Sequence, residues 1–97
     1  MDDSLFQAVY INDLDTVRKL LDDKDVDVNE TDQLGRTLLQ IACYFGFYEV
    51  CKKLLEKGAK IDEDCFRRAE NGWDGFRHSE VIELLSERQK GNYPPYT

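Results

Sequence analysis

The chain has 97 residues, 41% of them hydrophobic and 34% charged, a composition typical of one small folded domain with a modest core. Its net charge of -7 argues against nucleic-acid binding, which needs clustered Lys and Arg side chains to contact phosphates. No apolar run approaches the length of a membrane helix, so we expect neither nucleic acid nor a membrane among its partners.

The negative charge is concentrated in the first third of the chain. Residues 1–31 carry nine acids and three bases (-6), residues 32–62 carry four and five (+1), and residues 63–97 carry seven and five (-2). A basic protein partner, drawn to the N-terminal end, would suit this asymmetry.

Three cysteines occur without a C-x-x-C motif, and the first two, Cys43 and Cys51, fall in apolar helical patterns. The N-terminal Met-Asp-Asp-Ser has no apolar segment of the kind found in a signal peptide. We therefore expect free thiols, a reducing compartment and a cytoplasmic protein.

The first two helices are predicted over residues 5–11 and 14–23, with Asn12 and Asp13 as the break between them. Residues 27–37 follow, with turn formers and a glycine but no helical period. This segment should project as a loop or hairpin.

A second helix pair begins at Thr37, a natural N-cap, and Gln40 completes a capping box. The predicted helix over 38–45 ends at Gly46, because glycine accepts the left-handed backbone of a sharp turn. The next helix is predicted over 48–57, followed by Gly58 as its C-terminal cap.

These two helix pairs repeat one another. Five residues of the first recur 34 positions later in the second: Leu5, Ala8, Asp15, Leu20 and Leu21 correspond to Leu39, Ala42, Glu49, Leu54 and Leu55. Residues 32–62 resemble the ankyrin repeat, with its pattern D-x-x-G-x-T-P-L-H-x-A and the following G-x-x-E-V-V-x-L-L-x-x-G-A-D-V-N. The matching residues are Asp32, Gly35, Thr37, Leu39, Ala42, Gly46, Glu49, Val50, Leu54, Leu55, Gly58, Ala59 and Ile61. The resemblance implies an all-α ankyrin-repeat solenoid of stacked helix-turn-helix units with short hairpin loops.

The sequence departs from this pattern in two places. Leu38 replaces the family's proline and Gln40 its histidine, so the hydrogen bonds that histidine makes to neighbouring turns are either missing or rebuilt by the glutamine. The third copy keeps the helical signature at Phe66, Ala69 and residues 80–85. It lacks about six hairpin residues and gains about four between its helices, as expected of a degenerate C-terminal cap with a solvated outer face.

We thus predict a domain over residues 1–87, with repeats at 3–31, 32–62 and 63–87, and a tail at 88–97. The tail begins with helix residues and breaks at Gly91, Pro94 and Pro95. A frayed end is favoured for it, and the alternative is that Tyr93 or Tyr96 docks on the last repeat.

The residue inventory does not favour an enzyme. His78, the only histidine, lies in a glycine-rich turn and is interpreted as a cap or surface residue. The acidic runs at 22–27 and 62–64 lack the glycine and distal glutamate of a calcium loop. We therefore expect no catalytic residues, no metal and no cofactor.

The resemblance implies that hairpin tips and the exposed ends of the first helices line a concave groove that binds proteins. Carried over to this chain, that surface comprises Glu30, Gln33, Leu34 and Arg36 on the hairpin, Tyr44 and Phe45 at a helix end, and Tyr10 and Ile11 at the equivalent positions. Trp73 and Phe76, in the insertion, either extend the row of side chains formed by Tyr10, Ile11, Tyr44 and Phe45 or close over the end of that row. Phe47 and Tyr48 are predicted to face the core.

We therefore expect a protein-protein interaction module. Its charge and size would suit an adaptor or a stoichiometric inhibitor of a basic partner, such as an immunity-type protein. The alternative is a structural protein that self-associates through the same aromatic patch, although a monomer is favoured over a homo-oligomer.

Overall fold

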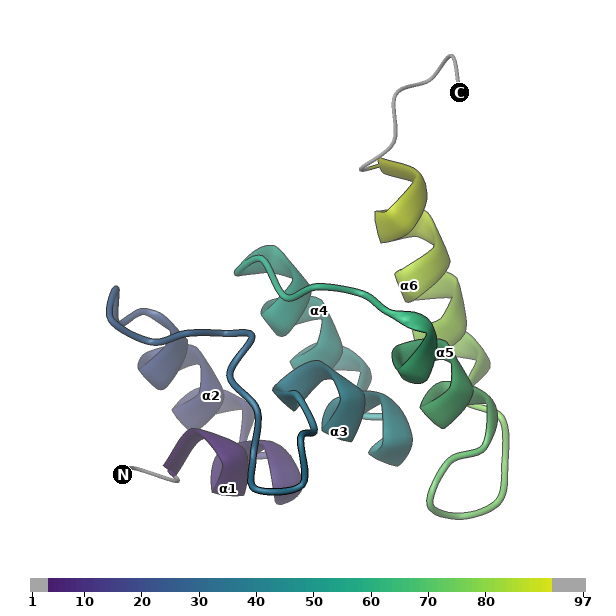
Figure 1. Ribbon diagram of the computed structural model, residues 1–97, viewed down its shortest axis with the longest axis horizontal. Helices are drawn as coiled ribbons and strands as arrows, with labels where there is room; N and C mark the ends of the chain where they lie inside the picture. Colours follow the sequence, from purple (N-terminus) through teal and green to yellow (C-terminus); the bar gives the residue numbers. More distant parts are fainter. Residues whose placement is uncertain (1–3, 92–97) are drawn as a thin grey trace.

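A computed structural model of the chain describes residues 4–91, which form six helices and no strand. The helices are α1 (Ser4–Tyr10), α2 (Leu14–Leu21), α3 (Leu38–Phe45), α4 (Tyr48–Glu56), α5 (Glu63–Glu70) and α6 (Ser79–Gly91). Helices α1, α3 and α5 pack side by side in one layer, and α2, α4 and α6 pack in a second layer (Figure 1). The predicted all-α solenoid of three helix pairs is confirmed.

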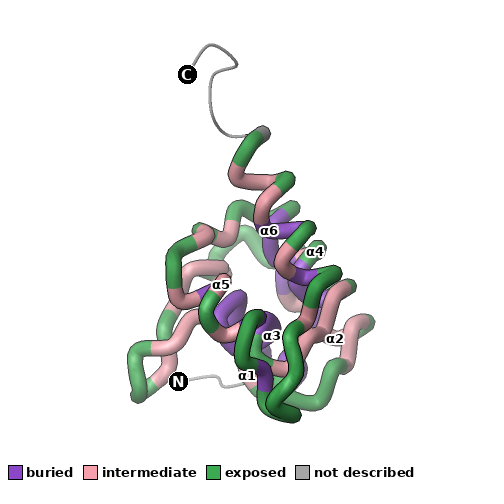
Figure 2. The backbone as a smooth tube through the Cα atoms, turned by 90° about the vertical axis from the view of Figure 1, so that its right-hand side faces the viewer, coloured by how far each residue is buried: buried purple, intermediate pink, exposed green. Residues whose placement is uncertain are grey.

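The core lies between the two layers, where leucine, valine, alanine and cysteine side chains are buried while most of the connecting loops stay exposed (Figure 2). Cys43 of α3, Cys51 of α4 and Cys65 of α5 are free thiols with no exposed surface. Contact with the Cys51 thiol, together with burial, raises the pKa of Cys43 far above its ordinary range, and contact with the Cys43 thiol and burial do the same for Cys65. Cys43 and Cys65 therefore pack as small apolar groups and are poor nucleophiles.

The first helix pair ends slightly earlier than the sequence predicts. Helix α1 stops at Tyr10 rather than residue 11, because Asn12 adopts the left-handed backbone conformation, with φ of 59°, that reverses the chain. Helix α2 stops at Leu21 rather than residue 23, because the side chain of Asp23 accepts a hydrogen bond from the amide of Asp25 and starts the loop.

The predicted capping box at the start of α3 is confirmed. The Thr37 hydroxyl accepts the amide of Gln40 at 3.1 Å, and Oε1 of Gln40 accepts the amide of Thr37 at 3.0 Å. The Gln40 amide nitrogen also donates to Oδ2 of Asp62 at 3.0 Å, and Oδ1 of Asp62 caps α5 through the amide of Cys65. The glutamine thus rebuilds the link to the next repeat that the missing histidine left in question.

The third repeat departs from the other two as the sequence predicts. Its two helices are joined by residues 71–78, and only residues 57–62 precede it, against residues 22–37 before the second repeat. The long turn is tied back to α3 where the amide of Trp73 donates to the carbonyl of Tyr44 at 3.0 Å. None of the helices within residues 4–91 is long and apolar enough to cross a membrane.

His78 caps a helix, which is one of the two roles expected from the sequence. Its carbonyl begins α6 by accepting the amides of Val81 and Ile82. Its ring is not on the surface, however: the side chain is 17% exposed and lies against Gly46 and Gly72, where a Cβ on either glycine would overlap the imidazole. The ring therefore wedges between the turn of the second repeat and the inserted turn of the third.

The last helix runs through the predicted domain boundary at residue 87 and continues to Gly91. The helix residues expected at the start of the tail are therefore part of α6. Tyr93, Pro94, Pro95 and Tyr96 lie outside the described residues, and the division into a domain and a tail stays a prediction.

The Gln40 link can be tested with Gln40→Glu, which keeps an acceptor for the Thr37 amide but places a carboxylate against Asp62. We expect a loss of about 2 kcal/mol in the free energy of unfolding at neutral pH, because the buried carboxylate at position 40 loses the hydrogen bond to Asp62 and is repelled by its charge. Uptake of a proton by either carboxylate removes the repulsion, so the difference from wild type should shrink as the pH falls. Urea denaturation at several pH values measures this difference in the free energy of unfolding, with Gln7→Glu at an exposed position as control. A difference that does not change with pH would contradict the contact between Gln40 and Asp62.

The wedge can be tested by a double-mutant cycle between Gly72 and His78. Gly72→Ala should destabilise the chain by about 2 kcal/mol, because the added methyl overpacks against the imidazole. In a His78→Ala background the same change should cost at least about 1 kcal/mol less. Some strain should remain there, because the added methyl would still lie 3.0 Å from the carbonyl oxygen of Tyr44. Urea denaturation measures all four proteins. As a control, the destabilisation by Glu83→Ala at an exposed position should add to that by His78→Ala. If the effects of Gly72→Ala and His78→Ala were also additive, the His78 ring would not occupy the space next to Gly72.

Candidate functional site

Five aromatic side chains contributed by all three repeats form a continuous cluster around Phe45. The Phe45 ring centroid lies 5.9 Å from that of Tyr10, 5.3 Å from Tyr44, 5.3 Å from Phe47 and 6.5 Å from Trp73. Three of these contacts are edge-to-face or tilted, and the Phe47 ring stacks on Phe45. We call this cluster the aromatic stripe.

The stripe presents some of its rings to solvent and uses the others as support. Tyr10 and Tyr44 are each 36% exposed and Trp73 is 59% exposed, whereas Phe45 and Phe47 are half-buried against the core. The expectation that Phe45 is exposed like Tyr44 is therefore wrong, because neighbouring rings surround it. Trp73 extends the stripe and does not close over its end.

In residues 4–91, three other large apolar side chains outside the stripe are exposed. Ile11 follows Tyr10 directly and is 72% exposed, Leu34 at the hairpin tip is 77% exposed, and Phe76 is 72% exposed. Tyr48, predicted to face the core, is half-buried and packs against its edge. Within the described residues Phe76 makes no ring contact with the stripe, so of the two aromatic residues in the insertion only Trp73 joins it.

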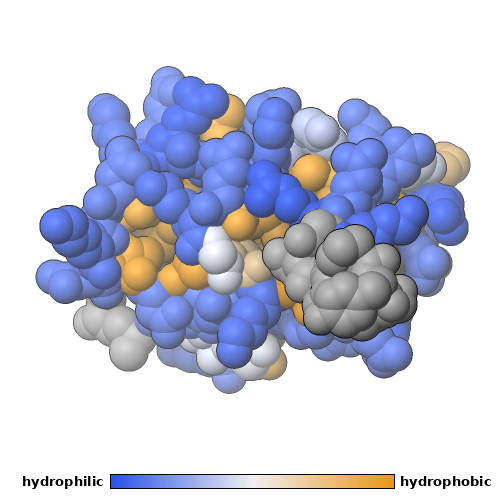
Figure 3. Space-filling view, turned by 90° about the horizontal axis from the view of Figure 1, so that it is seen from above, coloured by the Kyte–Doolittle hydropathy of each residue, from blue (hydrophilic) through white to orange (hydrophobic). Residues whose placement is uncertain are grey.

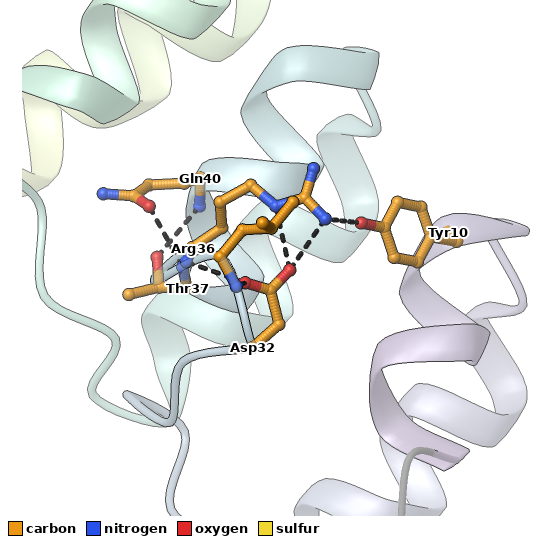
Figure 4. A network of polar contacts seen from close by, with 6 residues as sticks. Tyr10, Asp32, Arg36, Thr37 and Gln40 are labelled. Atoms are coloured by element: carbon orange, nitrogen blue, oxygen red, sulfur yellow. Dashed lines mark hydrogen bonds and ion pairs between the residues drawn. The ribbon is translucent and has the colours of Figure 1, made fainter.

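The hairpin that projects between the first two repeats, residues 30–37, is organised by one carboxylate (Figure 4). Oδ1 of Asp32 accepts the backbone amides of Leu34 and Arg36, each at 2.9 Å, and Oδ2 accepts both Nε and Nη2 of Arg36 at 2.8 Å. Gly35 completes the turn with φ of 79°. We call residues 30–37 the finger.

Arg36 also connects the finger to the first repeat, because its Nη2 donates to the hydroxyl of Tyr10 on α1 (Figure 4). Burial alone would raise the pKa of Asp32, but the hydrogen bonds from Arg36 and Leu34 outweigh it and lower that pKa. The same carboxylate raises the pKa of Arg36. Both groups are therefore charged at neutral pH and largely satisfy one another.

A groove of about 640 Å³ runs between α1 and the finger. It is lined by Phe6, Gln7, Tyr10, Glu30, Thr31, Asp32, Gln33, Leu34 and Arg36. We call it the finger groove. It brings together five of the predicted site residues, Tyr10, Glu30, Gln33, Leu34 and Arg36, whereas Ile11, Tyr44, Phe45 and Trp73 lie outside its lining.

Four lining residues of the finger groove, Phe6, Gln7, Thr31 and Asp32, were not among the predicted site residues. Phe6 could have been found in the sequence, because it precedes Tyr10 by four residues and therefore shares its face of α1.

In the described part of the chain, no three His, Cys, Asp or Glu side chains gather closely enough to hold a metal ion. The arrangement combines exposed rings, a groove and one carboxylate, that of Glu30, without an ion pair among residues 4–91.

Known proteins are similar to this chain over its repeats. It is 42% identical over 59 residues to the palmitoyltransferase akr1 of Schizosaccharomyces pombe, an alignment that covers 61% of this chain and 9% of that protein. It is 42% identical over 55 residues to the acyl-CoA-binding domain-containing protein 6 of Rattus norvegicus, over 57% of this chain and 20% of that protein. It is 40% identical over 94 residues to the ankyrin repeat and KH domain-containing protein mask of Drosophila melanogaster, over 84% of this chain and 2% of that protein. The chain spans a fifth or less of the length of these relatives.

A family model described as ankyrin repeats (3 copies) matches residues 5–93, and so includes the irregular third helix pair. The match agrees with the two-layer stack of helix pairs, the projecting finger and the Thr37 capping box. The chain therefore belongs to the ankyrin-repeat family, whose repeats are non-catalytic modules that generally mediate protein-protein interaction.

Proposed function

We propose that this chain binds a partner protein through the aromatic stripe and the adjoining finger groove. The observation that carries the proposal is the ring cluster itself, which presents exposed aromatic surface from all three repeats side by side. Tyr and Trp are the usual anchors of protein interfaces, because they bury a large area and retain a polar group that can hydrogen-bond.

The support beneath the rings favours tight binding. Phe45 touches four other rings, and Arg36 holds the hydroxyl of Tyr10, so these side chains have little freedom left to lose. A surface ordered before binding avoids much of the entropic cost of immobilising side chains at the interface. Trp73 gains similar order from the hydrogen bond between its amide and Tyr44.

The finer role that we propose is that of an adaptor or a stoichiometric inhibitor of a basic partner in the cytoplasm. The net charge of -7 supports a basic partner through electrostatic steering. Three free thiols buried in the core suit a reducing compartment. Self-association through the same stripe is the competing function, supported by the exposure of Tyr10, Tyr44 and Trp73.

Replacing Tyr44 and Trp73 together by alanine should remove the main partner from affinity capture followed by mass spectrometry. These two are chosen because they are exposed, whereas Phe45 supports the fold. Loss of two aromatic anchors should weaken binding at least about tenfold without unfolding the chain, as circular dichroism can verify. Phe76→Ala is the matched control, an exposed aromatic residue outside the stripe, and should bind like wild type. Retention of every partner by the double variant would falsify the proposed surface.

Light scattering separates the proposal from self-association. The purified chain should have the mass of a monomer at micromolar concentrations, since the stripe is reserved for a different protein. A dimer of the wild-type chain that becomes a monomer on the Tyr44 and Trp73 replacement would instead support self-association.

A further inference from the structure

A second groove adjoins the finger groove on the first repeat and shares Glu30 with it. This groove, of about 520 Å³, is lined by Leu5, Leu20 and Val26 and by the carboxylates of Asp23, Asp25, Asp27 and Glu30. Leu5 is buried and Leu20 and Val26 are half-buried, while the three aspartates are exposed. It therefore has an apolar floor and an acidic rim, and we call it the acidic groove.

Two of the four rim carboxylates are held in place by backbone amides, and none of the four is neutralised by an ion pair among residues 4–91. Oδ1 of Asp23 accepts the amide of Asp25, and Oδ1 of Asp27 accepts the amide of Asn29, each at 2.9 Å. Among residues 4–91, neither the three aspartates nor Glu30 takes part in an ion pair. Lys24 is close in sequence but is not among the residues that line the groove.

The finger groove differs from its neighbour in its charge. Arg36 is satisfied there by Asp32 and by Tyr10, which leaves Glu30 as the unpaired charge. The remaining wall offers the apolar surfaces of Phe6 and Leu34. One groove is therefore mainly apolar and the other acidic, with Glu30 on the wall between them.

Apolar surface is visible among hydrophilic residues on the side of the molecule that holds the first repeat (Figure 3). The rim carboxylates do not converge as metal ligands, since the described residues contain no cluster of three that could hold an ion. A Lys or Arg side chain has the complementary chemistry, because its methylene stem packs on apolar surface while its charged end stays at the rim.

We propose that the first repeat binds an extended basic segment of the partner protein, with an apolar side chain in the finger groove and a Lys or Arg side chain in the acidic groove. The inference rests on the proposed function and specifies the partner's chemistry. The two grooves are neighbours, because Glu30 lines both. In an extended segment every second side chain points to the same face, and successive side chains on that face are about 7 Å apart, so the two anchors are expected two to four residues apart. Glu30 attracts a further cation between them.

The test titrates the isotope-labelled chain with the synthetic peptide Gly-Ser-Leu-Ser-Lys-Gly-Lys-Ser-Gly and follows backbone amide shifts by NMR. Amides of residues lining the two grooves should shift, and the affinity should fall as NaCl rises from about 50 to about 500 mM, because salt screens the rim charges. Two further peptides, one with Glu for both Lys and one with Ser for Leu, should each bind at least about tenfold more weakly. Equal binding of the Lys and Glu peptides, shifts confined to the aromatic stripe, or no shifts with any peptide at about 5 mM would overturn the inference.

A matched pair of variants locates the charge. Asp23→Asn, Asp25→Asn and Asp27→Asn together keep the side-chain acceptors that hold the loop but remove three charges, and should weaken the Lys peptide about tenfold. The control triple variant Asp15→Asn, Glu49→Gln and Glu80→Gln removes three exposed charges from the starts of α2, α4 and α6 and should bind like wild type. Equal weakening by both would mean that net charge alone acts, contrary to the inference.

The captured partner separates this inference from the function beneath it. A partner lost by both the aspartate triple variant and the Tyr44 and Trp73 variant supports both. A partner lost only by the Tyr44 and Trp73 variant leaves the proposed function standing and rejects the basic segment. A partner retained by both variants rejects the proposed function itself.

Discussion

The arrangement of the second and third repeats depends on one buried amide group, the side chain of Gln40. It is 6% exposed, and its oxygen and nitrogen both have partners, the Thr37 amide behind it and the Asp62 carboxylate ahead of it. Because a buried amide is costly to leave unpaired, α3 and α5 can pack only where both bonds form. That packing brings the inserted turn within reach of the Tyr44 carbonyl and so places Trp73 beside Phe45.

The parts of the fold that the sequence predicts are those with local signals. The capping box needs only residues 37 and 40, and the turns at Asn12 and Gly46 need only a residue that accepts a left-handed backbone. The same holds for the absence of a hairpin before the third repeat, which is a matter of counting residues against the repeat length. The first two helices end one or two residues early, α1 at the left-handed turn of Asn12 and α2 where the Asp23 side chain accepts a backbone amide.

The contacts that join different repeats could not be predicted in the same way. The bond from Arg36 to Tyr10 links residues far apart in sequence and depends on how the finger leans toward α1. The wedge of His78 against Gly46 and Gly72 depends on the path of an insertion that has no counterpart in the other copies. The half-burial of Phe45 follows from both, since its neighbours come from three repeats. Residue type marked the stripe, but stacking decided which rings remain exposed.

Within residues 4–91 the finger occurs once, between the first two repeats, and the link before the third repeat is too short to form another. The two ends of the stack of repeats are therefore unlike: the first has a hairpin beside acidic side chains, and the last has a broad turn that carries Trp73. Such a surface has a direction. A linear partner of the kind proposed, laid across it in the opposite chain direction, would bring its anchors to the wrong ends, so the single hairpin would select an orientation as well as a sequence.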